Sequence, residues 1–245
     1  MVFDDTRYPN KRPEFKGKNG GGNLAKSVVS QIIGANVDYF AAVDFGRFTK
    51  IIDTLGKIEV DVPKTFDDYF YPVKGLENET CGKSAEEIAD LHSKYSEFEL
   101  EKQFTCRYEH LHFDRGLITI DGEAALKFVR SRHGDGDFGR SERQFAVLEA
   151  INKKLITLSA FSKEGNLLNT LFGMVKTDLS VNKIYEIYQI LGEIGGYKVT
   201  KIHLSEDNTL IAKKGPQGQY ILIPKAGINN YTEIQNIIQQ VMPSN

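Results

Sequence analysis

The sequence predicts an α/β protein in which helices lie on both sides of a mixed central sheet. Segments with apolar residues at helical spacing are intermixed along the 245 residues with segments that alternate apolar and polar residues. The composition, 40% hydrophobic and 26% charged, is an ordinary globular balance, and the length is sufficient for a substantial core. These observations together favour an α/β sandwich.

The first predicted elements follow an irregular segment. Residues 1–22 are polar and rich in glycine and proline, so no core element is expected there. Asn23 suits the N-cap of a helix that ends at Gly34, because apolar residues recur between them at helical spacing. A strand within 37–45, a short helix over 48–56 and a strand over 58–63 are expected to follow.

Residues 64–112 differ in composition from their surroundings and are predicted to form an insertion. The segment is aromatic at its start and then acidic and helical, with Cys81 and Cys106 at the two ends of the helical part. A disulfide between these cysteines would close a loop of about 25 residues and stabilise it by a few kcal/mol. Free thiols in a reducing compartment are the alternative that composition alone leaves open, and we predict the insertion to be closed by the disulfide.

The main domain is predicted to span residues 23–160 around this insertion. Asp121 can cap a helix over 122–129, and a further helix is expected to begin near Phe138 or Gly139. Residues 161–245 are expected to continue the same core. They are predicted to form helices over 167–175, 181–194 and 231–242 and strands over 198–204, 209–214 and 219–224.

Charge and hydropathy argue against several classes of protein. The formal net charge is −2, whereas a protein that binds nucleic acid through phosphates normally carries a basic excess. The sequence has no run of about 18 apolar residues that would span a bilayer, and its first twenty residues lack the apolar core of a signal peptide. Because the net charge is slightly negative, any anion site in this chain must be local.

One stretch, VRSRHGDGDFGRSERQ at residues 129–144, contains four arginines. Arg130 and Arg132 lie two residues apart in what should be an extended link between two helices, so their guanidinium groups can point the same way. The glycines of the link allow the backbone to turn sharply. Planar donors that converge near a helix N-terminus suit a diphosphate, because each guanidinium can bind two phosphate oxygens.

The helix after the link carries the other members of the cluster. Arg140 and Gln144 share one face of this helix, and Arg143 lies close to that face. Asp137 can cap the first turn and hold a guanidinium in place. The alternative is a surface lattice of salt bridges that adds little to stability. The glycines of the link favour a binding site, because an exposed helix start needs no such hinge.

Residues 121–144, DGEAALKFVRSRHGDGDFGRSERQ, resemble the signature of the LytR-CpsA-Psr family, which consists of a DGxxAL helix, an R-x-R pair, D-x-x-R and a final R-Q. Residues 20–63 resemble the family more weakly. The resemblance implies a membrane-anchored, extracytoplasmic phosphotransferase of cell wall biogenesis. Such an enzyme moves a glycopolymer from a polyprenyl-pyrophosphate carrier to a wall acceptor such as peptidoglycan.

The resemblance also implies roles for individual residues. Those expected to bind the pyrophosphate are Arg130, Arg132, Arg140, Arg143 and Gln144. Arg132 and Arg140 are also expected to act in catalysis, together with Asp137. This carboxylate would orient an arginine or accept the proton of the acceptor hydroxyl.

The chain departs from the family pattern at its N-terminus. Family members have an anchor, then aspartate-bearing strands that bind Mg²⁺, then an S-I-P-R-D-T segment. Here VFDDTRYP matches only the tail of that segment, with Asp4 in place of the arginine. The Mg²⁺ ligands are therefore expected to be missing from this chain, and an incomplete copy is the favoured explanation. A degenerate site would instead give a non-catalytic binder of pyrophosphate lipids or anionic wall polymer, and free thiols would favour a cytosolic structural domain.

His110 and His112, in the sequence HLH, place two imidazoles on one face of a predicted strand, a geometry that a metal ion uses. No third ligand lies nearby in the sequence. We therefore expect two surface histidines at the end of the insertion and predict no metal site in this chain.

Overall fold

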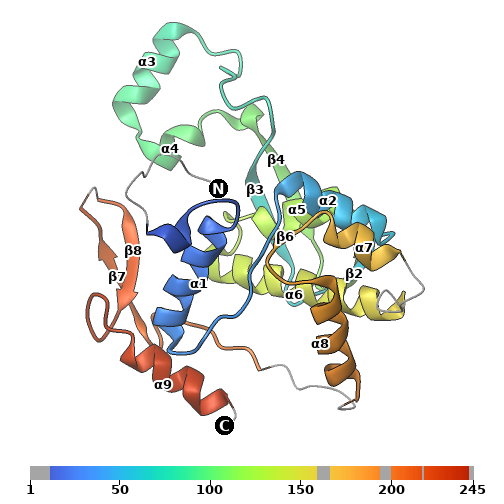
Figure 1. The fold of residues 1–245 in the computed structure, drawn as a ribbon. Coiled ribbons are helices and arrows are strands. Elements are labelled where there is room, and N and C mark those ends of the chain that lie inside the picture. The colour runs from blue at the N-terminus through green and yellow to red at the C-terminus, as the bar shows by residue number, and fades with distance from the viewer. Residues whose placement is uncertain (1–11, 159–165, 194–199, 217, 243–245) are drawn as a thin grey trace. The chain divides into compact units, whose positions relative to one another are not determined.

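The computed structural model describes residues 12–158, 166–193, 200–216 and 218–242, without the side chains of residue 137 and residues 190–193. The chain divides into two compact units (Figure 1). One unit is Val43–Met174, and the other combines Met1–Ala42 with Val175–Asn245. The predicted α/β class is confirmed, since helices and strands are intermixed along the described residues, but their strands form separate antiparallel pairs in place of the expected mixed central sheet.

The unit Val43–Met174 is built on a two-stranded antiparallel ribbon. β2 (Ile58–Val62) pairs with β5 (Gly116–Ile120), and Ile58 lies opposite Ile120. The side chains of β2 are alternately buried and exposed, which confirms the strand predicted from its alternating sequence. The long helix α6 (Gly136–Thr157) packs against β2. The buried core comprises Ile52, Leu55, Ile58, Val60, Val62, Phe66, Ile120, Ala125, Phe128, Val147, Ala150 and Leu171.

Two helices of this unit pack closely on each other. α2 (Phe45–Thr54) contacts α5 (Gly122–Arg130), which in turn contacts α6. The side chain of Asp121 accepts a hydrogen bond from the backbone N–H of Ala124 at 2.9 Å, so the predicted cap of α5 is confirmed. α7 (Leu167–Phe172) adds buried leucines on the same unit. α6 begins at Gly136, two residues before the predicted start at Phe138.

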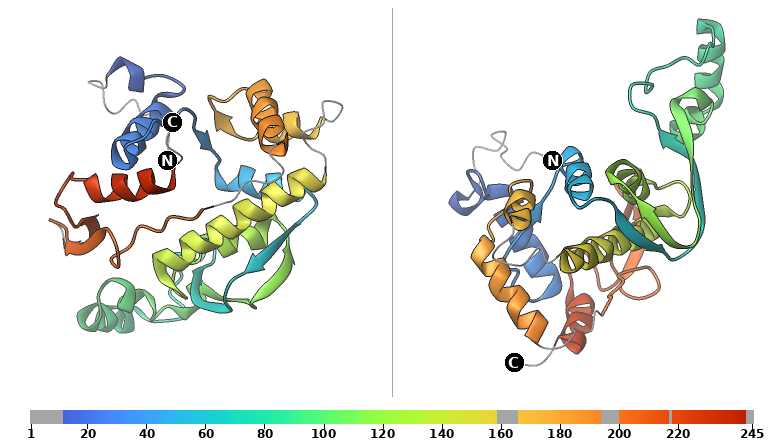
Figure 2. Two further views of the ribbon diagram at one scale, coloured as in Figure 1. Left: turned by 90° about the horizontal axis from the view of Figure 1, so that it is seen from below. Right: turned by 90° about the vertical axis from the view of Figure 1, so that its right-hand side faces the viewer.

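The insertion is a long β-ribbon that carries helices at its end. β3 (Phe66–Pro72) pairs antiparallel with β4 (Tyr108–Phe113), and between them lie α3 (Ala85–Lys94), α4 (Glu97–Glu101) and the short helix η2 (Thr105–Arg107). Figure 2 shows this ribbon leading away from α5 and α6 toward α3 and α4.

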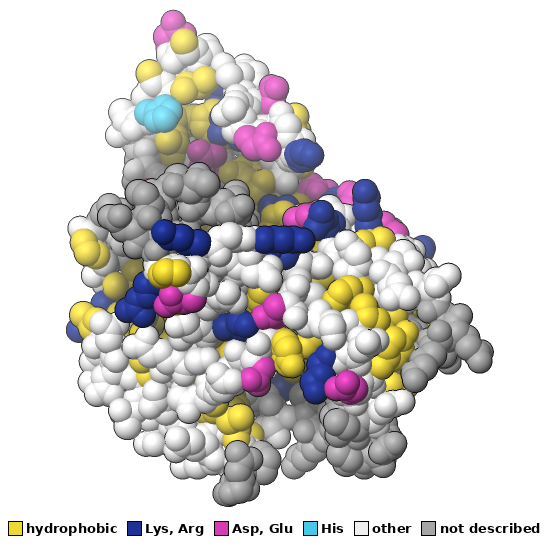
Figure 3. Space-filling view, in the orientation of Figure 1, with side chains coloured by type: hydrophobic (Ala, Val, Ile, Leu, Met, Phe, Trp, Pro, Cys, Tyr) yellow, Lys and Arg dark blue, Asp and Glu magenta, His cyan; other side chains and the backbone are white. Residues whose placement is uncertain are grey.

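A disulfide between Cys81 and Cys106 closes the helical end of the insertion, which confirms the predicted bridge. Ser84 and Glu87 form a capping box at the start of α3, so this helix has its own N-terminal stop signal. In the upper part of Figure 3 the insertion exposes hydrophobic side chains beside acidic ones, and Tyr95 and Phe98 are among the exposed aromatic residues.

The second unit contains helices from both ends of the chain. η1 (Pro13–Phe15) packs on α1 (Gly20–Ile33), and α1 also contacts α9 (Thr232–Val241). α1 begins three residues before the predicted cap Asn23, and the glycines of its first turn allow Phe15 and Phe40 to approach closely. The predicted stop at Gly34 and the predicted C-terminal helix are confirmed.

The strands of the second unit are short antiparallel pairs. β1 (Ala41–Ala42) pairs with β6 (Lys176–Thr177), and β7 (Leu210–Lys214) pairs with β8 (Tyr220–Pro224) as a hairpin. α8 (Val181–Glu193) begins after Ser180, whose hydroxyl accepts a hydrogen bond from the backbone N–H of Lys183.

Two predicted strands differ from the structure. The strand expected within 37–45 is reduced to β1, and residues 200–204, the described part of the expected strand 198–204, form no strand. Among the described residues every strand belongs to a two-stranded antiparallel pair. Apolar alternation alone does not produce a strand, because a strand also needs a partner edge for its backbone hydrogen bonds.

Candidate functional site

The arginine-rich stretch folds as a short link between two helices. α5 ends at Arg130, Ser131 is its C-cap in an extended conformation, and α6 begins at Gly136. The link therefore consists of residues 131–135, which contain Arg132. Such a short connection cannot form secondary structure of its own, so its conformation depends on side chains that satisfy its backbone groups.

Asp68, on β3, binds the backbone of this link from one side. Its side chain is 1% exposed, and Oδ2 accepts hydrogen bonds from the Ser131 hydroxyl at 2.5 Å and from the backbone N–H groups of Arg132 and His133 at 3.2 and 3.3 Å. Oδ1 accepts one from the N–H of Phe70. Burial alone would raise the pKa of Asp68, but these hydrogen bonds outweigh it and hold the pKa below its usual value.

Arg143, on the first turns of α6, binds the link from the interior. Its side chain is 2% exposed. Nε donates to the carbonyl oxygen of Phe128 at 2.8 Å, Nη2 donates to the carbonyl of Ser131, and Nη1 forms an ion pair with Asp135. The guanidinium also lies over the ring of Phe66, with its carbon 4.3 Å from the ring centroid. Arg143 thus ties the end of α5, the link and α6 together.

Arg130 is exposed, and its side chain lies against two aromatic side chains. Its guanidinium carbon lies 4.6 Å from the ring centroid of Phe45, and Nη1 donates to the hydroxyl of Tyr71 at 3.5 Å. Burial raises the pKa of Tyr71, and the nearby charge of Arg130 opposes that rise. These contacts orient Arg130 at the C-terminal end of α5.

The other expected site residues lie on or next to the link. Arg132 is exposed and Arg140 is half-buried one turn into α6. Gln144 is exposed, and its side-chain amide donates to the carbonyl oxygen of Val129 at 3.3 Å. Asp137 lies in the first turn of α6, but its side chain is outside the described part of the chain. Among the described side chains of the cluster, Asp135 pairs with the guanidinium of Arg143.

The insertion contacts the link directly. The ring of His133 stacks on the ring of Phe98 from α4, with 4.5 Å between centroids and 7° between planes, and it meets the edge of Phe70 from β3. Nδ1 of His133 also lies 3.5 Å from Oδ1 of Asp68. The conformation of the link therefore depends on residues of the insertion as well as on the two helices.

Sequence analysis missed three residues that shape this site, namely Asp68, Ser131 and Asp135. Asp68 is separated from Ser131 by 63 residues, so only the pairing of β3 with β4 and their packing on the link bring the two together. One signal was present, because an aspartate between aromatic residues in FDDYFYP is polar at a position that the strand alternation predicts to be buried. Asp135 lies within the arginine-rich stretch, for which the alternative was a surface lattice of salt bridges.

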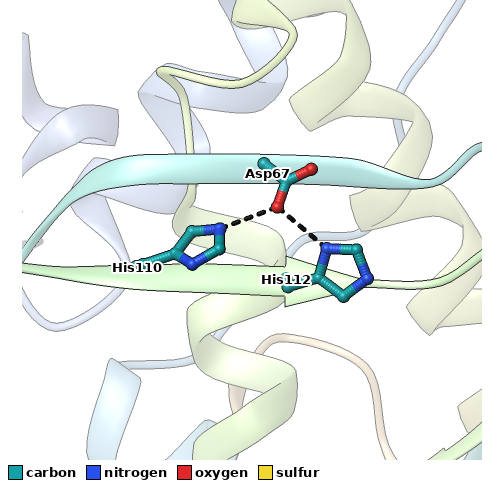
Figure 4. A group of neighbouring side chains, drawn as sticks. All are labelled: Asp67, His110 and His112. Atoms are coloured by element: carbon teal, nitrogen blue, oxygen red, sulfur yellow. Dashed lines mark hydrogen bonds and ion pairs between the residues drawn. The ribbon is translucent and has the colours of Figure 1, made fainter.

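A second cluster lies on the exposed face of the β3–β4 ribbon (Figure 4). Oδ1 of Asp67 lies 2.7 Å from Nε2 of His110 and 2.8 Å from Nδ1 of His112. The three ligand atoms lie within 4.8 Å of one another, and the group could hold a metal ion. Hydrogen bonds from His112 and His110 lower the pKa of Asp67, and the bond to Asp67 raises the pKa of His112.

The two histidines are exposed as expected, and the structure adds a third candidate ligand that the sequence does not place near them. Asp67 lies directly opposite His112 in the antiparallel register, although 45 residues separate them in the sequence. The pairing of β3 with β4 brings the carboxylate of Asp67 next to the two imidazoles, and this could not be seen from the sequence because the residues are far apart along the chain.

Comparison with known proteins places the chain among characterised relatives. The LytR_cpsA_psr family matches residues 16–237. The polyisoprenyl-teichoic acid–peptidoglycan teichoic acid transferase TagU of Bacillus licheniformis is 28% identical over 194 residues, which are 78% of this chain and 50% of that protein. TagU of Bacillus subtilis is 26% identical over 76% of this chain and 47% of its own length. This chain thus spans about half the length of these relatives.

Solved structures agree with these sequence matches at the level of the fold. The crystal structure of TagV from Bacillus subtilis covers 91% of this chain with a TM-score of 0.56 at 22% identity, and the match covers 70% of that chain. Within the described residues, no helix combines the length and the apolar character that crossing a membrane requires.

Proposed function

This chain belongs to the LytR-CpsA-Psr family, and from that membership we propose that it transfers a glycopolymer from a polyprenyl-pyrophosphate carrier to a cell-wall acceptor. The relatives named above are teichoic acid transferases that act on a polyisoprenyl-linked polymer and peptidoglycan. We extend that class of donor and acceptor to this chain. The observation that carries the proposal is the arginine-bearing link, whose backbone is fixed by two buried charged groups, Asp68 and Arg143.

In this proposal Arg130, Arg132 and Arg140 bind the pyrophosphate. The role proposed for Arg130 is supported by its position at the end of α5, where contacts with Tyr71 and Phe45 restrict the orientation of its side chain. Arg132 is held by the backbone bond to Asp68, and Arg140 lies in the same helix as the anchoring Arg143. Donors that are oriented before the reaction stabilise developing charge on a phosphoryl group without reorganising during the step.

We assign Arg143 a positioning role, because its guanidinium is buried and binds the carbonyl oxygens of Phe128 and Ser131. Gln144 is exposed beside it and remains a candidate for contact with the substrate. Asp68 also acts through the link, since its carboxylate binds the backbone of Arg132 and His133. Removing either buried residue would misplace the arginines rather than remove a direct contact.

The chemical step is a displacement at phosphorus. The acceptor hydroxyl attacks the phosphorus that carries the sugar, a new P–O bond forms, and the P–O bond to the bridging oxygen breaks. Polyprenyl phosphate leaves with the negative charge, which the arginines neutralise. The proton of the acceptor hydroxyl goes to a base, and we propose Asp137 for this role because it precedes Arg140 by three residues at the start of α6.

Mg²⁺, which the family resemblance implies, prefers near-octahedral oxygen ligands. The one metal-capable cluster among the described residues offers two imidazole nitrogens and one carboxylate oxygen. This donor set does not fit Mg²⁺. The transfer step is accordingly assigned to side chains of this chain only.

We propose that the protein acts on the outer face of the cell membrane, where both lipid carrier and wall acceptor are present. The disulfide between Cys81 and Cys106 supports this location, because such bonds persist in oxidising compartments and are rare in reducing ones.

The test is an assay of polymer transfer from a polyprenyl-pyrophosphate donor to peptidoglycan, with the protein made from its complete reading frame. We expect Arg132→Ala and Arg140→Ala to lower turnover about a hundredfold or more, roughly 3 kcal/mol of transition-state stabilisation. Arg47→Ala is the matched control, because Arg47 is exposed on α2 and pairs only weakly with Asp44. Its turnover should equal that of the wild type.

Unchanged turnover in both variants would remove their proposed role. Salt-sensitive binding of the pyrophosphate lipid without any turnover would instead identify a non-catalytic binder of the same lipid. These two results are distinct, since binding is measured separately by titration of the lipid in detergent.

A further inference from the structure

We propose that Asp67, His110 and His112 form a binding site for a divalent transition-metal ion, with Zn²⁺ as the best match. The site lies on the exposed face of the β3–β4 ribbon and is separate from the arginine link. Nothing in the proposed transfer reaction uses these three residues, so the inference stands apart from that function.

The backbone brings the three ligand atoms together. Asp67 is directly opposite His112 in the antiparallel pairing, and His110 is two residues away on the same face of β4. The distances of 2.7 and 2.8 Å from Oδ1 of Asp67 to the two ring nitrogens are hydrogen-bond lengths. Ligand atoms around tetrahedral zinc lie about 3.3 Å apart for metal–ligand bonds of about 2.0–2.1 Å. Side-chain rotations that lengthen the two Asp67–histidine distances by roughly half an ångström, and that bring the two ring nitrogens from within 4.8 Å of each other to this spacing, would form the site.

Both imidazoles are oriented by contacts outside the cluster. Nε2 of His112, on the far side of the ring from the site, lies 3.2 Å from Oδ1 of Asp114. This is the carboxylate–histidine–metal arrangement in which an outer carboxylate fixes the tautomer and raises the basicity of the ligating nitrogen. The ring of His110 stacks on that of Tyr69 with 4.1 Å between centroids and 3° between planes.

The donor set decides which ion fits. Two imidazole nitrogens and one carboxylate oxygen suit Zn²⁺, Cu²⁺ and Ni²⁺, whereas Mg²⁺ and Ca²⁺ take oxygen ligands. Three protein ligands leave a fourth position of a tetrahedral zinc ion for water, which is accessible because both histidines are exposed. An ion that binds here replaces the protons shared between the imidazoles and the carboxylate.

Because of the position of the site, a bound ion would also restrict the movement of β3. Asp67 and Asp68 are consecutive on β3, so their side chains lie on opposite faces of the ribbon. A metal that joins Asp67 to β4 thus fixes the strand whose other face holds Ser131 and the link. We expect metal binding to raise the thermal midpoint of unfolding, since the unfolded chain lacks the site.

The experiment is isothermal titration of the untagged 245-residue chain, stripped of metal, with ZnCl₂ and in parallel with MgCl₂. A polyhistidine tag would bind zinc itself and is left out. The variants are His110→Gln, His112→Gln and Asp114→Asn. His92→Gln is the matched control, because His92 is an exposed histidine of the same insertion on α3. Circular dichroism checks that each variant is folded.

We expect one Zn²⁺ per chain, no saturable binding of Mg²⁺, and affinity at least tenfold weaker in His110→Gln and His112→Gln. Asp114→Asn should weaken binding about tenfold, since loss of an outer carboxylate typically lowers metal affinity by that order. His92→Gln should bind as the wild type does. Absence of zinc binding by the wild type, or wild-type affinity in both histidine variants, would overturn the proposal. If His112→Gln does not fold, His110→Gln and Asp114→Asn decide the result.

Discussion

The carboxylate of Asp68 accepts a hydrogen bond from the hydroxyl of Ser131 at 2.5 Å, and both side chains are 1% exposed. This bond joins a strand of the insertion to the link between α5 and α6, across 63 residues of sequence. Because the same oxygen also receives the backbone N–H groups of Arg132 and His133, one buried carboxylate determines the conformation from which the arginines extend.

The first prediction concerns this pair. We expect Asp68→Asn and Ser131→Ala each to lower the free energy of unfolding by about 1–3 kcal/mol, since each leaves buried polar groups unsatisfied. The double variant should lose less than the sum, with a coupling of about 0.5–3 kcal/mol. Urea unfolding of the wild type, the two single variants and the double variant measures this coupling as a double-mutant cycle. Additive losses would show that the two side chains do not interact.

The second prediction concerns Arg143. We expect Arg143→Met to lower the free energy of unfolding by about 3–5 kcal/mol, because it leaves Asp135 and the carbonyl oxygens of Phe128 and Ser131 without their buried partner. Arg47→Met is the control, because Arg47 and Asp44 are both more than half exposed and such pairs contribute about 0–1 kcal/mol. Equal stability of the two variants in urea unfolding would contradict the buried role of Arg143.

Local patterns predicted much of this fold. The alternation in β2, the cap at Asp121 and the stop at Gly34 are encoded within a few residues, and each is confirmed. The pair of cysteines was also predictable, because their positions at the ends of one helical segment suggested a closed loop. Each of these features depends on neighbours in the sequence or on a simple loop.

The candidate site was predictable only in part, because half of it comes from distant segments. The arginines of residues 129–144 are contiguous and could be found by inspection. Asp68 and Asp67 reach their partners only through the register of β3 with β4, which no local pattern specifies. The burial of Arg143 was also hidden, since a helix face with arginine and glutamine is normally solvated.

The third prediction concerns the disulfide. Replacing both Cys81 and Cys106 by serine should remove a constraint on a loop of 25 residues, worth roughly 3 kcal/mol for the insertion. We expect limited proteolysis to cut faster between residues 73 and 107, while the remaining core of Val43–Met174 resists. Because Phe98 stacks on His133, the link should also become more mobile in hydrogen exchange. Cleavage rates equal to those of the oxidised wild type would contradict this expectation.

The fourth prediction concerns pH and the second unit. Asp178 forms an ion pair with Lys26 and accepts a hydrogen bond from the N–H of Phe40. Burial alone would raise the pKa of Asp178, but these partners outweigh it and hold the pKa below 3.8. Its contribution to stability is therefore fully present above pH 3.8 and is lost as the pH falls through the lower folded pKa.

We accordingly expect Asp178→Asn to lower the thermal midpoint of unfolding at pH 7 and to have a smaller effect near pH 3, where the wild-type carboxylate also begins to lose its charge. Asp90→Asn is the control, since Asp90 and Lys94 form an exposed pair on α3. A shift of the midpoint for Asp178→Asn that is equal at both pH values would contradict the assignment.

The last prediction concerns the contact between α2 and α5. A Cβ atom at Gly122 would lie 2.3 Å from the carbonyl oxygen of Thr49, which is backbone and cannot rotate away. Gly122→Ala should therefore force the two helices apart and lower the free energy of unfolding by about 1–3 kcal/mol. Gly46→Ala, on the exposed first turn of α2, meets only the side chain of Asp44 at 3.5 Å. Alanine is the better helix former by up to about 1 kcal/mol, so that variant should be at least as stable as the wild type. Urea unfolding that ranks Gly122→Ala at or above Gly46→Ala would show that the helices can separate freely, and that the close approach does not position α5 or the link that follows it.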